Sequence, residues 1–275
     1  MARERLSGWR KLAAALWKEP DDPQMYGILD VRAAALLDFI ENARGQGHHV
    51  TPTHLVGRAV AHALSAVPEL NVRLVSGGAI PRESIEVFFI TAVAGGRELT
   101  GVKVSDIDRK SAVAVARELH ERSQQMKRGA EPELARAKAL MQRLPTPVLR
   151  SGLRLASWAA GVRAWSIPWM GLSAVPFGGA MVSSVGMFGL PVGFAPLVWL
   201  YRVPLIILAG EIEPRPVAVE GRVEVQPVLP LGVTADHRHV DGAHLGEALK
   251  AFRGYLEAPG DFEPEMPAAD EVHAG

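Results

Sequence analysis

The sequence DHRHVDG at residues 236–242 decides how this chain is interpreted. An apolar, strand-like run at residues 228–233 precedes it, and a helical pattern begins near Ala243. Histidine is the side chain best suited to take a proton near neutral pH. A histidine at the end of a buried strand, followed at fixed spacing by Asp241 and Gly242, therefore predicts that His237 takes part in proton transfer.

The composition limits the kind of protein and of chemistry. The chain has 275 residues, of which 48% are hydrophobic and 22% charged, which fits one large globular domain. Its 30 basic and 30 acidic side chains cancel, so we expect no nucleic-acid partner. The absence of cysteine excludes disulfides, thiolate metal sites and a cysteine nucleophile. The charged first 22 residues do not have the pattern of a secretory signal, and we expect a cytoplasmic protein.

Apolar periodicity predicts a mixture of helices and strands without strict alternation, which favours an α/β sandwich over a barrel. We expect residues 1–262 to form one domain, and the acidic, Pro/Ala-rich residues 263–275 to be a disordered tail. The predicted strands cover residues 25–31, 72–75, 85–93, 102–104, 180–185, 203–210 and 228–233. The predicted helices cover residues 33–43, 51–67, 111–127, 148–165 and 243–256.

The stretch from residue 134 to residue 210 is unusual because it holds seven basic side chains and no acidic one. Within it, residues 148–169 contain three tryptophans on a basic, amphipathic pattern. Such a helix can lie on a membrane surface. It can also form an additional helical layer on the domain, and this second interpretation is the one we favour.

Six segments, in order along the chain, resemble the catalytic domain of the dihydrolipoyl acyltransferases of 2-oxoacid dehydrogenase complexes. More distantly, the chain is similar to chloramphenicol acetyltransferase. The segments are Trp9-Arg10-Lys11, Asp30-Val31, Pro68-Glu69-Leu70-Asn71, residues 178–186, residues 236–242 and Leu256-Glu257-Ala258-Pro259. The resemblance implies a chloramphenicol acetyltransferase-like mixed sheet sandwich with flanking helices, and it makes residues 134–172 a helical insertion.

The chain also departs from the family pattern. Residues 93–104 differ from the segment that lies near the substrate channel in the family. The spacing from Gly178-Gly179 to the serines is one residue shorter. We find neither a lipoyl domain nor a subunit-binding domain, and we therefore expect no lipoyl group on this chain. The apolar C-terminal anchor that links trimers into cages in the family is replaced by the acidic tail.

The resemblance implies thioester exchange, with coenzyme A as a substrate. His237 would be the general base that deprotonates the attacking thiol. Ser183 would donate a hydrogen bond to the tetrahedral oxyanion, and Ser184 is the competing choice because neighbouring strand residues face opposite sides. Asp241 alone could be a second base, but the family assigns it an ion pair with Arg10 that holds the histidine loop.

By resemblance we also expect a homotrimer with active sites between subunits, and no larger cage. The acyl acceptor would be the lipoyl arm of a separate protein or a small thiol, and 2-oxoacid dehydrogenase subunits are candidate partners. Two alternatives remain open: acyl transfer to a small-molecule hydroxyl, and a non-catalytic scaffold that keeps the fold. His237, His239 and His244 could suggest zinc, but no fourth ligand is evident, so we predict no metal.

Overall fold

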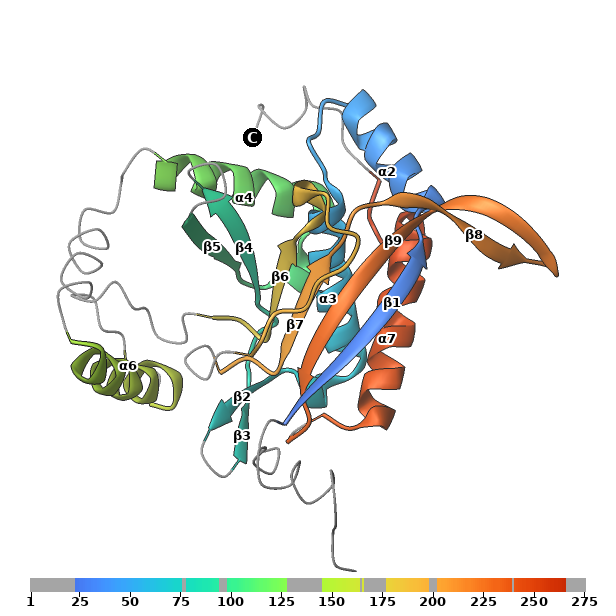
Figure 1. The fold of residues 1–275 in the computed structure, drawn as a ribbon. Coiled ribbons are helices and arrows are strands. Elements are labelled where there is room, and N and C mark those ends of the chain that lie inside the picture. Colours follow the sequence, from blue (N-terminus) through green and yellow to red (C-terminus); the bar gives the residue numbers. More distant parts are fainter. Residues whose placement is uncertain are drawn as a thin grey trace, which may run out of the picture.

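The computed structural model describes residues 23–75, 78–93, 98–127, 145–163, 165, 177–197, 202–238 and 240–265. Its centre is a seven-stranded sheet in the order β1-β9-β7-β6-β4-β5, with β8 paired to β9 outside this path (Figure 1). The strands are β1 (Gln24–Arg32), β4 (Val87–Val93), β5 (Glu98–Val104), β6 (Ala180–Ser184), β7 (Leu205–Ala209), β8 (Glu213–Val219) and β9 (Arg222–Asp236). A separate two-stranded sheet joins β2 (Val72–Val75) to β3 (Gly78–Pro81).

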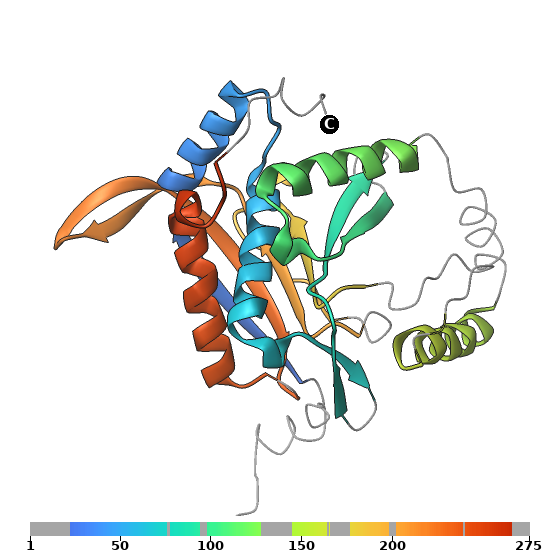
Figure 2. The same ribbon diagram turned by 180° about the vertical axis from the view of Figure 1, so that it is seen from behind.

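Helices cover one face of the seven-stranded sheet (Figure 2). They are α2 (Ala34–Gly45), α3 (Pro52–Ala66) and α7 (Gly242–Glu257), with α4 (Ala112–Lys127) across the β4–β5 end. Alternate residues of β9 point toward them: Leu229, Leu231 and Val233 are buried with Leu55 and Phe252 in one core. This alternation is the usual consequence of the two-residue period of a strand. The predicted α/β sandwich is confirmed.

Two strands were not predicted from the sequence. β8 contains Pro214 and Pro216, which argue against a strand in a sheet interior. The structure places β8 at an edge, where it pairs only with the first half of β9 among the described strands. β9 accordingly begins at Arg222 rather than at residue 228, and the β8–β9 hairpin projects from the sheet (Figure 1). The other unpredicted strand, β3, pairs with the short β2.

The sheet face opposite the helices is only partly covered within one chain. Met181, Ile206 and Leu208 form a small buried cluster there. The loop at residues 190–197 crosses this face so closely that a Cβ on Gly232 would lie 1.8 Å from a backbone oxygen of that loop. On β1, in contrast, Tyr26 and Ile28 remain 53% and 61% exposed. An apolar sheet face with exposed aromatic and aliphatic side chains is typical of an interface between proteins.

The folded domain extends beyond residue 262. We expected residue 263 to begin a disordered tail, but the Glu263 side chain is 1% exposed. Its carboxylate accepts hydrogen bonds from Arg58 Nε at 2.8 Å, from Ala112 N at 2.5 Å and from the Tyr255 hydroxyl. These groups belong to α3, α4 and α7, so Glu263 joins three helices. Residues 266–275 lie outside the described part of the chain.

The predicted helix at residues 148–165 is observed as α6 (Thr146–Gly161), which lies apart from α2, α3 and α7 in both views (Figures 1 and 2). One side of α6 is packed: Ala156, Ser157 and Ala160 are buried. Arg202 Nε donates to the Ser157 carbonyl at 3.1 Å and to its hydroxyl at 2.9 Å. The helix is thus fixed to the domain by one face. In the described part of the chain no helix has the length and apolarity to cross a membrane.

Candidate active site

His237 lies just beyond the end of β9, in an exposed turn. Its backbone N–H donates to the Pro23 carbonyl at 2.8 Å, next to the start of β1. Because β1 and β9 pair over the whole length of β1, this hydrogen bond continues the antiparallel ladder by one step beyond Asp236. The backbone of His237 is therefore fixed by the sheet, while its imidazole is left at the surface.

The buried carboxylate of Asp236, just before His237, shapes the backbone of this turn. The Asp236 side chain is 3% exposed and accepts hydrogen bonds from Arg238 N at 3.0 Å and Arg238 Nε at 2.9 Å. The hydrogen bond to Asp236 raises the pKa of Arg238. These hydrogen bonds between Asp236 and Arg238 hold the backbone on both sides of His237 in a tight turn. This contact was not predicted from the sequence. An aspartate at a strand end can accept a hydrogen bond from the backbone two residues later, so the spacing of Asp236 and Arg238 could have indicated it.

Asp241 is the N-cap residue of α7. Its Oδ1 accepts hydrogen bonds from Ala243 N and His244 N, each at 3.0 Å, and lies 2.9 Å from His244 Nδ1. The hydrogen bond from the backbone of His244 lowers the pKa of Asp241, so it stays ionised near neutral pH. Asp241 is therefore suited to a structural role, and its position before a helical run could have predicted the cap. Arg10, its predicted ion-pair partner, lies outside the described residues.

The two candidate serines on β6 point to opposite faces of the sheet. Ser183 pairs in register with Leu208 of β7, and Leu208 belongs to the cluster on the face away from the helices. Ser184 pairs with Ala209, which belongs to the core under the helices. Both serines are half-buried. Only Ser183 therefore faces the side of the sheet that this chain leaves partly open.

Within one chain, Ser183 and His237 are not brought together. Ser183 is level with Leu208, which in turn is level with Gly232 on β9. His237 lies five residues further along that strand direction and two strands away. With about 3.4 Å per residue and about 4.8 Å between strands, the Cα atoms of the two residues are about 20 Å apart. A single chain cannot place both on one reacting carbonyl.

The glycine pair before β6 has a structural role. Gly179 N donates to the Glu86 carbonyl at 2.7 Å, and a Cβ on Gly179 would lie 2.5 Å from the Asn71 Oδ1. Asn71 is buried and donates from Nδ2 to the Ser84 carbonyl at 3.1 Å. Two segments that carried the sequence resemblance, residues 68–71 and 178–186, thus meet where β6 begins, and together they set its position beside β4.

A cavity of about 580 Å³ opens between β4, α4 and the start of α3, on the helix-covered side of the sheet to which Ser184 points. Thr91 of β4 lines this cavity. Since Phe89 pairs with Val182 of β6, Thr91, two residues further on, is level with Ser184. None of the described residues that line the cavity carries a carboxylate. Its polar lining is basic or hydroxyl-bearing: His48, His49, His54, His120, Arg117, Thr51, Thr53, Thr91 and Ser123. Such a lining suits a ligand that carries negative charge or hydrogen-bond acceptors.

His54 presents a defined hydrogen-bonding group to this cavity. Thr51, the N-cap residue of α3, donates its backbone N–H to His54 Nδ1 at 3.1 Å. Burial lowers the pKa of His54 to about 4, so the ring is neutral at physiological pH. Because Nδ1 accepts a hydrogen bond, the proton of the neutral ring resides on Nε2, which is therefore a donor.

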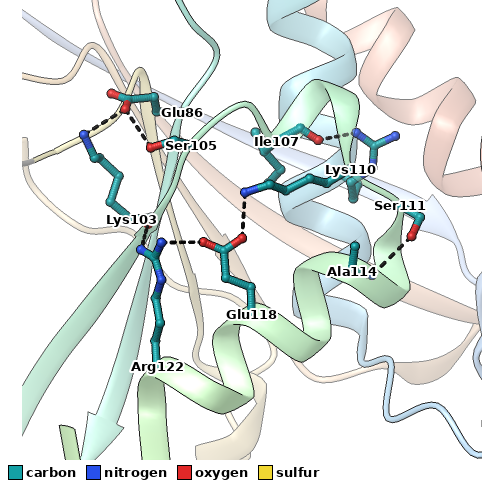
Figure 3. Close-up of polar contacts among 10 residues, drawn as sticks. Glu86, Lys103, Ser105, Ile107, Lys110, Ser111, Ala114, Glu118 and Arg122 are labelled. Atoms are coloured by element: carbon teal, nitrogen blue, oxygen red, sulfur yellow. Dashed lines mark hydrogen bonds and ion pairs between the residues drawn. The ribbon is translucent and has the colours of Figure 1, made fainter. Parts of the chain in front are cut away.

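The wall formed by α4 is held to the sheet by ion pairs (Figure 3). Glu118 lies 2.6 Å from Lys110 Nζ and 2.7 Å from Arg122 Nη2. Arg122 also donates from Nη1 to the Lys103 carbonyl of β5 at 2.7 Å. These contacts tie α4 to β5 and occupy the Glu118 carboxylate. The described residues include no group of three or more His, Asp or Glu side chains placed to hold a metal ion, and His239 lies outside them.

Comparison with known families gives one match over most of the chain. Residues 2–133 and 177–262 match the family described as 2-oxoacid dehydrogenases acyltransferase (catalytic domain). The match is interrupted at residues 134–176, the segment that contains α6.

Two curated relatives show the same similarity over a shorter stretch. One is the dihydrolipoyllysine-residue acetyltransferase component of the pyruvate dehydrogenase complex of Mycoplasma genitalium, 38% identical over 76 residues, or 28% of this chain and 19% of the relative. The other is the probable dihydrolipoyllysine-residue succinyltransferase component of the mitochondrial 2-oxoglutarate dehydrogenase complex of Schizosaccharomyces pombe, 35% identical over 78 residues, or 28% of this chain and 17% of the relative. The aligned region thus spans less than a fifth of these relatives' length.

Solved structures of similar proteins have the same fold. A probable dihydrolipoamide acetyltransferase from Listeria monocytogenes aligns with a TM-score of 0.65 and 20% identity over 98% of both chains. The cubic core of a pyruvate dehydrogenase multienzyme complex aligns with a TM-score of 0.62 and 20% identity, over 88% of this chain and 84% of that one. A dihydrolipoamide acetyltransferase from Azotobacter vinelandii, studied for the catalytic roles of a serine, a histidine and an asparagine, aligns with a TM-score of 0.61, 20% identity and the same coverage.

Proposed function

Because this chain belongs to the 2-oxoacid dehydrogenase acyltransferase family, we propose that it transfers an acyl group between coenzyme A and a dihydrolipoyl-type thiol. The similarity to dihydrolipoyllysine acetyl- and succinyltransferase components supports this substrate class. Support also comes from the position of His237, whose imidazole is at the surface while its backbone is fixed by β1. A base held in this way can reach a substrate without first rearranging.

The proposed reaction is a direct exchange between two thioesters. His237 takes the proton of the incoming thiol, and the resulting thiolate attacks the acyl carbonyl carbon of the donor thioester. The carbonyl oxygen becomes a tetrahedral oxyanion, which the Ser183 hydroxyl stabilises by donating a hydrogen bond. When the intermediate collapses, the bond to the donor sulfur breaks, and the proton on His237 passes to the departing thiolate. No redox change occurs and no metal is needed.

The separation of Ser183 from His237 is the observation that carries the proposal. Since about 20 Å divides them in one chain, the complete site requires His237 of one subunit and Ser183 of another. A closed ring of identical subunits provides such a site at every interface. By resemblance to the family, we propose that this ring is a homotrimer. The apolar sheet face that carries Tyr26 and Ile28 would be covered in it.

The cavity lined by His54 and Arg117 lies on the helix-covered face of the sheet, on the side to which Ser184 points, and is a candidate binding site for a charged part of a substrate. Its basic lining suits the phosphates of coenzyme A or a carboxylate on the acyl chain. The acyl acceptor would be a lipoyl arm carried by a separate protein, and 2-oxoacid dehydrogenase subunits are the corresponding partners. In this proposal the exchange takes place in the cytoplasm, where coenzyme A and lipoyl-bearing complexes would be available.

The direct test is acyl transfer from acetyl-CoA to free dihydrolipoamide by the wild type and by His237→Gln, which keeps the backbone hydrogen bond but removes the base. We expect the substitution to lower kcat at least about a hundredfold, with an unchanged circular dichroism spectrum. Retention of activity within tenfold would refute the role of His237. If the wild type transfers acetyl groups to a hydroxyl acceptor such as chloramphenicol but not to dihydrolipoamide, the acceptor class is an alcohol.

A further inference from the structure

The outer side of α6 is an exposed apolar ridge. Val148, Leu155 and Trp158 are 55%, 66% and 40% exposed, and Trp165 just beyond the helix is 57% exposed. The first three lie on one helical face because they are spaced seven and three residues apart. Trp158 and Trp165 stack edge to face with ring centres 6.0 Å apart. We call these four residues the α6 ridge.

The α6 ridge is not needed to hold α6 on the domain. The opposite side of the helix, with Ala156, Ser157 and Ala160, is already buried, and Arg202 is hydrogen-bonded to Ser157. Exposing large apolar side chains to water is unfavourable, yet these side chains are exposed on a helix that lies at the periphery of the molecule (Figures 1 and 2). These exposed side chains are therefore available to contact something other than this domain.

The charges around the α6 ridge have one sign. Arg150, Arg154 and Arg163 are exposed beside it, and the Arg163 guanidinium lies 5.3 Å from the ring centre of Trp158. The sequence contains no acidic side chain from residue 134 to residue 210. The surface of α6 thus combines tryptophan and leucine with arginine, and α6 itself carries no carboxylate, which is the composition of helices that bind at a membrane interface.

Two other groups of exposed apolar side chains have different surroundings. Val223 and Val225, at the tip of the β8–β9 hairpin, are 77% and 74% exposed, but Glu224 lies between them and Glu220 lies in the turn. Tyr26 and Ile28 lie on the sheet face that the proposed trimer would cover. The α6 ridge differs from both groups because the charged side chains on its own helix are all basic.

We propose that the α6 ridge binds the surface of an anionic phospholipid bilayer, so that α6 lies parallel to the membrane plane. Leu155 and Val148 would enter the boundary between headgroups and acyl chains, and Trp158 and Trp165 would occupy the headgroup level. Arg150 and Arg154 would contact lipid phosphates. With 16 residues, α6 is about 24 Å long and lies along the surface without spanning the bilayer. This segment lies in the stretch that the family match omits, so the binding is a property separate from acyl transfer.

The test is co-sedimentation of the full chain with phosphatidylcholine vesicles that contain phosphatidylglycerol, compared with vesicles of phosphatidylcholine alone. We expect binding to the anionic vesicles that weakens as salt is raised. Leu155→Glu should abolish it, whereas the matched control Val223→Glu should not. The double substitution R150E/R154E should weaken binding at least about 25-fold, since each basic side chain near an anionic surface contributes about fivefold. The control R222E/R253E reverses two exposed arginines elsewhere and should bind like the wild type.

Several outcomes would overturn the proposal. They are the absence of vesicle binding by the wild type at low salt, equal binding to neutral vesicles, and equal losses in Leu155→Glu and Val223→Glu. Light scattering provides a further measurement on the same proteins: a change of oligomeric state in Leu155→Glu would show that the ridge is an interface between copies of the chain. Because Leu155 is 66% exposed, its substitution should leave the circular dichroism spectrum and the acyl-transfer rate unchanged.

Discussion

Replacing Glu263 by alanine should destabilise the protein severely, although the residue lies near the C-terminus. The substitution would leave the Arg58 guanidinium, whose side chain is 10% exposed, without its carboxylate partner. It would also remove the acceptor for Ala112 N at the start of α4 and for the Tyr255 hydroxyl. Breaking a buried ion pair from one side costs about 3–5 kcal/mol. For a chain of this size that cost should lower Tm by about 6–20 °C.

The assay is urea unfolding at fixed protein concentration, followed by circular dichroism. The matched control is Glu257→Ala, which breaks an ion pair with Arg32 whose side chains are 54% and 22% exposed. Such an exposed pair contributes about 1 kcal/mol or less. A chain ending at residue 262 should behave like Glu263→Ala, whereas a chain ending at residue 265 should match the wild type. If Glu263→Ala costs less than about 1 kcal/mol, the role assigned to this cluster is wrong.

Three further predictions concern the candidate site. Ser183→Ala should lower kcat by about a hundredfold or more, since an oxyanion donor contributes about 3 kcal/mol, whereas Ser184→Ala should have little effect; equal effects would contradict the assigned faces. Burial lowers the pKa of His54 from 6.5 to about 4, so the unfolded chain takes up a proton that the folded chain does not, and stability should fall by about 2 kcal/mol between pH 7 and pH 5. The free energy of unfolding, measured by urea titration at each pH, should fall less between pH 7 and pH 5 in His54→Gln than in His49→Gln. An identical pH dependence in the two variants would refute a buried, neutral His54. The pKa of Asp241 is lowered from its usual value of 3.8, so its ionised side chain stabilises α7 at pH values above 3.8. The difference in Tm between the wild type and Asp241→Ala should therefore shrink as the pH falls through and below that value. A difference that does not change with pH would argue against the N-cap role.

Local periodicity was sufficient to predict most elements. The run at residues 51–67 combines an N-cap threonine and an early proline with helical spacing, and α3 follows this pattern closely. β8 was missed because its prolines argue against a strand, and only its position at the sheet edge makes them compatible with pairing. Glu263 was assigned to a tail because composition is a local property, whereas its partner Arg58 lies 205 residues away in sequence.

The candidate site was predictable in its residue types but not in its geometry. The sequence identified His237 and the pair Ser183-Ser184, and strand alternation already placed the two serines on opposite faces. Which face is the open one depends on β7 and on the helices that cover the other side, which no local pattern reveals. The separation of Ser183 from His237 likewise follows from the order of β6, β7 and β9 in the sheet. The cavity combines residues of α3, α4 and β4, which are distant from one another in the sequence, so no local pattern predicted it.

The measurement that most directly tests the account is complementation between two inactive variants, His237→Ala and Ser183→Ala, coexpressed in equal amounts. If each site takes His237 from one subunit and Ser183 from its neighbour, random assembly gives an intact pair at about a quarter of the interfaces. The mixture should therefore recover about a quarter of the wild-type activity, although each variant alone is inactive. Activity in the mixture no higher than in the separate variants would contradict a site formed between subunits.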